Sequence, residues 1–319
     1  YGFRLDYFGF DWQKLKTARD RFVSDINEWY LSYLAEAGVT LIRGAARFAD
    51  ARTLTVGSER YSADHLVIAT GGRPRIPNLP GAQFGITSDG FFELNACPAR
   101  VAIVGSGYIA MELAGMLHAL GAEVTLLVRK DQVLRSFDAM LREQLMERLR
   151  EDGVTVLTHT QVRAVARLAS GAFSLHCEGP GNAPNVNVVL WAIGRDPNTD
   201  ALDLAAAGVT LNLDGSIPTD PCQNTNVPGV YAIGDVTERF HLTPVAIAAG
   251  RRRGRVHLRV VEPEGVFRRW HVHLGLGEHE RAVFLAQAVD VVAVVVADHH
   301  VVDVFGLEAG RGQLRRELA

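Results

Sequence analysis

The sequence of 319 residues is poor in cysteine, with three in all: Cys97, Cys177 and Cys222. They lie far apart and form no C-x-x-C pair, which excludes a disulfide framework and favours a reducing, cytoplasmic location. No apolar run reaches the ~18 residues that a membrane helix needs, and no signal peptide is recognisable. The net charge of -3 gives no reason to expect nucleic acid or a membrane as a partner.

Residues 252–319 lack Ser, Thr, Asn, Lys, Tyr, Ile, Met and Cys, yet they hold six of the eleven histidines. Hydroxyl and amide side chains cap helices and build turns, so a native domain of this length needs them. We therefore interpret residues 252–319 as an atypical tail, either translated from a wrong reading frame or disordered. The alternative is a divergent domain in which Val291–Val296 forms a central strand. The histidines do not have the context of a metal site, and we predict none.

The most informative stretch is Val101–Arg135, which predicts a strand, a glycine turn, a helix and a second strand. Val101–Val104 is a short apolar run, typical of a strand that is buried on both faces. Gly105 allows a tight turn, Gly107 lets the backbone approach a pyrophosphate, and Ala110 permits close packing of helix on strand. The N-terminus of the helix offers free N–H groups to a phosphate. The stretch therefore predicts a dinucleotide-binding site.

The end of the second strand, Val124–Val128, indicates which dinucleotide binds. NAD-binding units usually carry Asp or Glu about 20 residues past the glycines, where it binds the ribose 2′-hydroxyl. This sequence has Arg129 and Lys130 there, and Arg135 follows. Because arginine pairs with phosphate in a bidentate manner, we predict that Arg129 and Arg135 bind the 2′-phosphate of NADPH. The alternative is that these cations belong to a solvated loop.

Further helices and strands are predicted on both sides of this stretch. Three apolar strands end in a small residue, one more residue and a glycine: Gly71, Gly194 and Gly234. Glycine in this position brings backbone close to a ligand in open α/β sheets. Helical patterns cover residues 1–38 and Asp138–Arg150, and further strand patterns cover Val39–Arg43, Thr53–Val56, Arg60–His65, Val154–Leu157, 161–178 and 186–193.

A family resemblance rests on four segments: LVIATGGRP, VAIVGSGYIAMELAG, LWAIGRDPNT and GVYAIGDV. Together with RGAARF, SDGFF, LVRK, LRSFD, QNTN and LTPVAIAAGRR, they make about residues 1–253 resemble the flavoprotein disulfide reductases, and the glutathione reductases in particular. The resemblance implies an α/β fold of three layers with β hairpins. In it, a Rossmann-like NADPH-binding domain is inserted in an incomplete FAD-binding domain. The implied parts are a partial FAD-binding domain (1–93), the NADPH-binding domain (94–218), a return segment of the FAD-binding domain (219–251) and the tail (252–319).

The resemblance also implies an activity and its residues. NADPH would reduce FAD, FAD a redox disulfide, and the dithiol glutathione disulfide, in a homodimeric enzyme. Tyr108 would cover the nicotinamide pocket, Glu112 would pair with a lysine near the flavin, and Tyr30 would lie at the glutathione site. The implied NADPH-binding residues are Gly105, Gly107, Tyr108, Ile109, Ala110, Glu112, Arg129, Arg135 and Gly194, and the implied FAD-binding residues are Ala46, Thr70, Gly71, Asp235 and Thr243.

The sequence also departs from that family. It contains no N-terminal FAD-binding glycine motif, no C-x4-C redox pair and no His-Pro dipeptide for the acid–base couple of the interface domain. The chain opens on Tyr1 rather than methionine, so we expect a piece of a longer reductase, inactive by itself and weak in FAD retention. The alternatives are a dihydrolipoamide dehydrogenase-like or other disulfide reductase, against which Arg129 argues, and a non-catalytic NADPH-binding protein.

Overall fold

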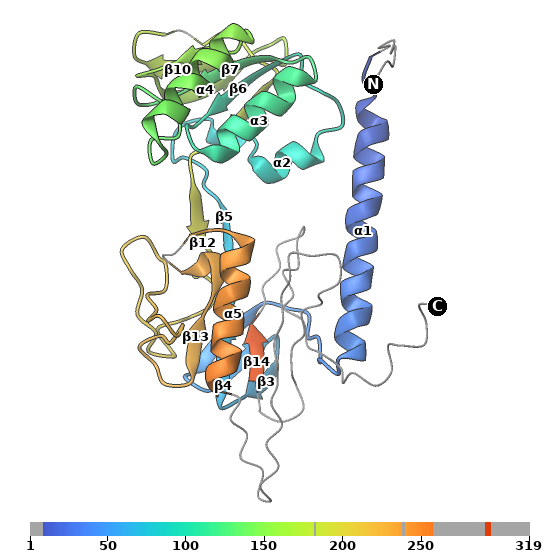
Figure 1. Cartoon of the computed structure of the whole chain (residues 1–319), viewed down its shortest axis with the longest axis vertical. Helices are drawn as coiled ribbons and strands as arrows, with labels where there is room; N and C mark the ends of the chain where they lie inside the picture. The colour runs from blue at the N-terminus through green and yellow to red at the C-terminus, as the bar shows by residue number, and fades with distance from the viewer. Residues whose placement is uncertain (1–8, 182, 238–239, 258–290, 295–319) are drawn as a thin grey trace, which may run out of the picture. The chain divides into compact units, whose positions relative to one another are not determined.

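A computed structural model of the chain describes residues 9–181, 183–237, 240–257 and 291–294. The chain divides into two compact units (Figure 1). Unit 1 comprises Tyr1–Arg21 and Pro74–Arg195, and unit 2 comprises Phe22–Arg73 and Asp196–Ala319. The chain passes between the units three times: within α1 (Trp12–Glu36), between Arg21 and Phe22, and at the paired strands β5 (Gly72–Pro74) and β12 (Arg195–Pro197).

Unit 1 is built on a parallel sheet of four strands in the order β11-β6-β7-β8. Val104 of β6 pairs with Leu127 of β7 on one side and with Trp191 of β11 on the other. Because these strands are parallel, their carboxyl ends meet at one edge of the sheet. The elements are β6 (Arg100–Val104), α3 (Tyr108–Ala119), β7 (Glu123–Leu127), α4 (Ala139–Glu151), β8 (Thr155–Leu157) and β11 (Val188–Trp191).

Two further layers flank this sheet and make three in all, because successive side chains of its strands point to opposite faces. Ile103 and Leu126 belong to a core cluster that includes side chains of α3 and α4. Ala102 and Leu127, one residue away, belong to a second cluster with the hairpin strands β9 (Gln161–Arg167) and β10 (Phe173–Glu178). The expected α/β class, with its layers and β hairpins, is confirmed.

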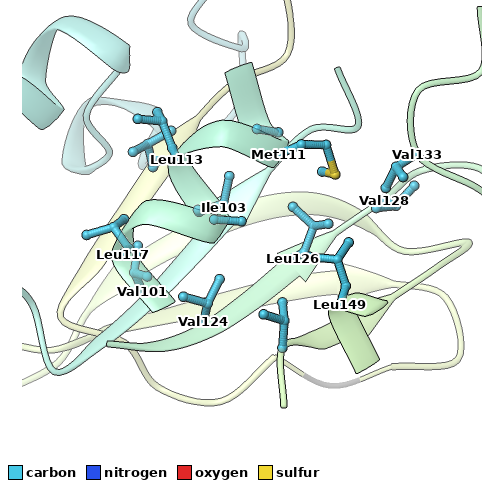
Figure 2. Packing of buried hydrophobic residues seen from close by; sticks show 14 of the residues in the cluster. Val101, Ile103, Met111, Leu113, Leu117, Val124, Leu126, Val128, Val133 and Leu149 are labelled. Carbon is cyan, nitrogen blue, oxygen red and sulfur yellow. The ribbon is translucent and has the colours of Figure 1, made fainter. Parts of the chain in front are cut away.

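Helices α3 and α4 cover one face of β6 and β7 (Figure 1). Figure 2 shows Leu113 and Leu117 of α3 and Leu149 of α4 gathered with the side chains of the strands. Helix α3 gives way to β7 at Gly121, whose φ of 98° is a left-handed value that glycine adopts readily. Helix α4 begins after Asp138, whose carboxylate accepts a hydrogen bond from the Met140 amide at 2.9 Å.

The described residues of unit 2 form two sheets of three strands each, besides the β5–β12 pair. One is an antiparallel meander, β1-β2-β3, and the other is a parallel sheet in the order β13-β4-β14. Leu66 and Ile68 of β4 are fully buried, which makes this strand the centre of the unit's core. The elements are β1 (Ala46–Asp50), β2 (Thr53–Val56), β3 (Glu59–Ser62), β4 (His65–Ile68), β13 (Val230–Ala232), η2 (Gly234–Val236), α5 (Thr243–His257) and β14 (Val291–Val294). The remaining elements of the chain are α1 (Trp12–Glu36), η1 (Ala82–Phe84) and α2 (Ser88–Glu93).

The predicted strand Val39–Arg43 is wrong, because this segment has no regular secondary structure. The amide of Val39 donates to the carbonyl of Leu34 at 2.9 Å, so the end of α1 uses the first residue of the segment. Leu41 and Ile42 are 50% and 39% exposed, so a large part of each side chain faces solvent. The first strand of unit 2 therefore starts later, at Ala46.

Other predictions differ in detail. The prolines after Gly72 predicted an irregular connection, yet Gly72–Pro74 forms β5. Residues 1–8 of the helical prediction lie outside the described residues, and α1 begins at Trp12. In the tail, Val291–Val294 forms β14, an edge strand parallel to β4. Most of residues 252–319 lies outside the described residues, and their origin in a wrong reading frame stays a prediction.

Replacing Leu126 by alanine is expected to lower the free energy of unfolding of unit 1 by about 2–5 kcal/mol, because this fully buried side chain fills the core under α3 and α4. Urea unfolding followed by circular dichroism measures the loss. The matched control is Leu141→Ala on α4, where the side chain is 47% exposed and the change should stay within about 0.5 kcal/mol. Equal losses in both variants would contradict this description of the core.

Candidate functional site

The turn after β6 requires glycine at Gly105. Its φ is 148°, and a Cβ there would lie 2.1 Å from the carbonyl oxygen of Ala192. Its amide donates to the carbonyl oxygen of Leu127 at 3.0 Å, which ties the turn to β7. Gly107 is different, because its φ of −84° is ordinary and a Cβ there would meet nothing within 4 Å. The backbone at Gly107 therefore faces open space, as the approach of a ligand would require.

Helix α3 starts at this opening, with Gly107 as its N-cap and no hydrogen bond from a capping side chain. The N–H groups of the first turn thus lack a capping acceptor on the N-cap residue, and the helix dipole favours an anion beside them. Tyr108 is 45% exposed and Ile109 is half-buried, whereas Ala110 is fully buried in the core. Glu112 is exposed on the next turn.

The loop after β7 carries the two predicted phosphate ligands. Arg129 follows the strand directly after Val128, and both Arg129 and Arg135 are exposed. Within the described residues, neither guanidinium makes a hydrogen bond or an ion pair. The amide of Leu134 donates to the carbonyl oxygen of Ser106 at 2.7 Å, so the loop lies against the glycine turn.

Gly194 follows β11 at the same edge of the sheet, since β11 pairs with β6 on the side opposite to β7. Its φ is 130°, and a Cβ there would meet nothing within 4 Å. The start of α3 without a side-chain cap, the open space at Gly107 and Gly194, and two guanidinium groups that are unpaired among the described residues therefore lie at one edge of the sheet. These groups could bind a phosphorylated dinucleotide, which carries negative charge both on its pyrophosphate and on the 2′-phosphate of its adenosine ribose.

In unit 2, three of the predicted flavin residues, Thr70, Gly71 and Asp235, lie beyond the carboxyl ends of β4 and β13. Thr70 is 2% exposed, and its hydroxyl donates to the carbonyl oxygen of Asn198 at 2.7 Å. Asn198 in turn donates from its side-chain amide to the Thr70 carbonyl at 3.0 Å, and from its backbone amide to the Gly71 carbonyl at 2.9 Å. Asp235 lies beside this turn, because a Cβ on Gly72 would come within 3.8 Å of the Asp235 Cβ.

The other predicted residues occupy three separate elements of unit 2. Ala46 is the first residue of β1 and pairs with Val56. Thr243 is exposed at the start of α5. Tyr30 lies on α1, where its ring makes an edge contact with Trp29 at 5.0 Å between centroids.

The three cysteines are free thiols. Burial raises the pKa of the Cys97 thiol, and burial also raises the pKa of Cys177 against the opposing hydrogen bond from Ala183. Both thiols are therefore poor in the reactive thiolate form at neutral pH. Across the described parts of the chain, no three His, Cys, Asp or Glu side chains are grouped as a metal site, and no helix is long and apolar enough to cross a membrane.

Two residues of these sites were not predicted from the sequence. Asn198 supports the Thr70 turn through both its side chain and its backbone. Leu134 has a φ of 46°, in a region that leucine rarely adopts, so nothing in its residue type signals the conformation. The LWAIGRDPNT segment contains Asn198 and the LRSFD segment contains Leu134, so both segments could have pointed to these residues, although neither indicates the left-handed backbone of Leu134.

The model of the pyridine nucleotide-disulphide oxidoreductase family matches residues 11–250. The chain belongs to this family. Family members of the glutathione reductase type use FAD and NADPH, as the resemblance implied. The match covers both units, since it runs from α1 into α5.

Curated relatives support the same placement. The chain is 43% identical over 251 residues to a glutathione reductase of Schizosaccharomyces pombe, covering 76% of this chain and 54% of that protein. It is 37% identical over 262 residues to a glutathione reductase of Nostoc sp., covering 79% of this chain and 57% of that protein. The predicted resemblance is confirmed, and the chain spans little more than half the length of these relatives.

Solved structures of the family share the fold. The HOCl-induced flavoprotein disulfide reductase RclA of Escherichia coli superposes with a TM-score of 0.72 at 24% identity, over 79% of this chain and 58% of that one. A Cu(II) complex of the same reductase gives a TM-score of 0.72 at 23% identity, over 77% of this chain and 57% of that one. At this level of identity, the likeness supports the fold alone.

Serine at Gly107 is expected to weaken NADPH binding while leaving the free energy of unfolding unchanged, because the added side chain has space and serine is a favourable N-cap. The same substitution at Gly105 is expected to destabilise unit 1 by at least ~1–3 kcal/mol, since it adds backbone strain and a clash with Ala192. Isothermal titration and urea unfolding of both variants separate the two effects. Loss of stability in Gly107→Ser would show that this glycine serves packing instead of access.

Proposed function

We propose that unit 1 binds NADPH and that the chain is part of an NADPH-dependent disulfide reductase of the glutathione reductase type. The observation that carries this proposal is the N-terminus of α3, which has no side-chain cap, beside a loop with two arginines that are unpaired among the described residues. The residues in question are Gly107 at the helix start and Arg129 and Arg135 after β7. The division of the chain that places the NADPH-binding domain at residues 94–218 is part of the same proposal.

The choice of NADPH over NADH follows from charge. Arg129 occupies the position at which an acid would bind the 2′-hydroxyl of NADH. A guanidinium there is attracted to a 2′-phosphate, and no carboxylate of the described part of the chain pairs with it. The same argument disfavours a dihydrolipoamide dehydrogenase, for which an acid at that position would be expected.

Unit 2 would contribute residues to a flavin site. When bound, FAD supplies a two-electron relay between the nicotinamide and a redox disulfide, and glutathione disulfide is the proposed final acceptor. Thr70, Gly71 and Asp235 would line the flavin at the strand ends, with Ala46 nearer its adenine and Thr243 nearer its ring. Tyr30 on α1 would contact glutathione, and Tyr108 would shield the nicotinamide from water before transfer.

The setting proposed for the parent enzyme is the cytoplasm, since three separate free thiols fit a reducing compartment. We infer a homodimer for that enzyme from its family. The curated relatives are longer, because the chain covers 54% and 57% of their lengths. The whole reaction is therefore proposed for the parent enzyme, and nucleotide binding for this chain.

Neutralising either arginine, in Arg129→Gln or Arg135→Gln, is expected to weaken NADPH binding by about 1.5–3 kcal/mol, roughly tenfold to a hundredfold, through loss of a charge-assisted hydrogen bond. NADH binding should change little, since NADH has no 2′-phosphate. Isothermal titration with both nucleotides measures the effect.

The matched control is Arg167→Gln, which removes the same charge from the exposed end of β9. It should leave both affinities unchanged at physiological salt. Equal affinity of the unmutated chain for NADPH and NADH would refute the assignment.

A chain of this sequence is expected not to reduce glutathione disulfide, even with FAD added. It contains no C-x4-C pair, and burial keeps the thiols of Cys97 and Cys177 largely protonated. NADPH oxidation in the presence of FAD and glutathione disulfide tests this, with an intact glutathione reductase as the positive control. Turnover that disappears when one of the three cysteines is changed to serine would overturn the expectation.

A further inference from the structure

Leu134 is a strained residue inside the loop that carries both arginines. Its φ of 46° lies in the left-handed region, where the side chain of an L-residue crowds the following carbonyl. The residue is nevertheless 9% exposed and belongs to the core cluster under α3 and α4. Strain of this kind persists only where the surrounding structure imposes it, and it concentrates at functional sites.

The contacts of Leu134 show what the strained conformation accomplishes. Its amide donates to the carbonyl oxygen of Ser106 at 2.7 Å, and Ser106 lies between Gly105 and Gly107 of the turn. Its carbonyl oxygen accepts from the amide of Phe137 at 2.8 Å, which begins the approach to α4. Leu134 therefore joins the arginine loop directly to the backbone from which α3 starts.

The first half of the loop is held elsewhere. The carbonyl oxygen of Lys130 accepts from the amide of His159 at 3.0 Å, next to the end of β8. The side-chain oxygen of Gln132 accepts from the guanidinium of Arg142 on α4 at 2.9 Å. The loop beside Arg129 is thus held through Lys130 and Gln132, whereas Arg135 follows directly on the link between Leu134 and the glycine turn.

We propose that Leu134 is a positioning residue for nucleotide specificity, which through its left-handed backbone sets Arg135 in register with the N-terminus of α3. This inference rests on the proposed binding of NADPH by unit 1. The 2′-phosphate and the pyrophosphate are attached to one adenosine, so their two protein sites must keep a matching separation. The Leu134–Ser106 hydrogen bond joins the backbone of these two sites directly.

The test is Leu134→Ile, which keeps the volume of the side chain but places a branched Cβ where φ is positive, a conformation that branched residues strongly disfavour. A loop that is correctly closed in fewer molecules binds more weakly in proportion. NADPH affinity is expected to fall about five- to tenfold, and NADH affinity to stay within about twofold. Leu134→Met, which has an unbranched Cβ and similar volume, should keep the preference for NADPH over NADH.

The control for core packing is Leu149→Ile on α4, in the same cluster. It should lower the melting temperature without changing the ratio of the two affinities. An unchanged ratio of NADPH to NADH affinity in Leu134→Ile overturns the inference. If both affinities fall equally, the inference is also overturned, and Leu134 supports the pyrophosphate turn alone. If Arg135→Gln abolishes the preference and Leu134→Ile does not, the proposed function stands and only this inference fails.

Hydrogen exchange on the unmutated chain tests the same link without any substitution. The Leu134 amide should exchange slowly in the free protein, and NADPH should protect it more than NADH does. An amide at Leu134 that exchanges as freely as those of an exposed loop overturns the proposal, including in the case that Leu134→Ile does not fold.

Discussion

The proposed nucleotide site of unit 1 depends on the close approach of two neighbouring strand ends. Where β6 ends, the Gly105 backbone passes the Ala192 carbonyl so closely that a Cβ would lie 2.1 Å from it. This approach lets β11, β6 and β7 end at one edge in unbroken parallel register, with Trp191, Val104 and Leu127 paired side by side. Because the three strands stay paired up to their last residues, one edge of the sheet carries the start of α3, Gly194 and the arginine loop.

The two glycines of the turn, Gly105 and Gly107, therefore have different structural roles. Gly105 is required by the protein itself, since both its φ and its packing forbid a side chain. Gly107 is under no such demand from the described residues, because its backbone is ordinary and its surroundings are open. The open space at Gly107 leaves room for a ligand, and on the proposal that unit 1 binds NADPH this space would be occupied by its pyrophosphate.

Sequence reasoning succeeded where one interaction dominates. The strand, turn, helix and strand from Val101 to Val128 were predictable because burial alone sets the spacing of their apolar residues. It failed at Val39–Arg43, where the apolar residues fit a strand pattern but pair with no described strand. It also missed Leu134, whose conformation is imposed by distant partners: the core cluster holds the side chain and the Ser106 carbonyl holds the amide. Propensity describes a residue alone and cannot contain such a constraint.

The connection through β5 and β12 uses a glycine of positive φ at each of two strand ends. Gly71 and Gly194 both have positive φ, and each directs the chain from the end of a parallel strand into the β5–β12 pair. The Gly71 carbonyl accepts from the Asn198 amide, and the Gly194 carbonyl accepts from the Arg75 amide, both at 2.9 Å. The carbonyl of each glycine thus accepts a hydrogen bond from the residue that follows the other strand of the pair: Asn198 follows β12 and Arg75 follows β5. A glycine at the end of each of these strands consequently fixes where the chain leaves the sheet.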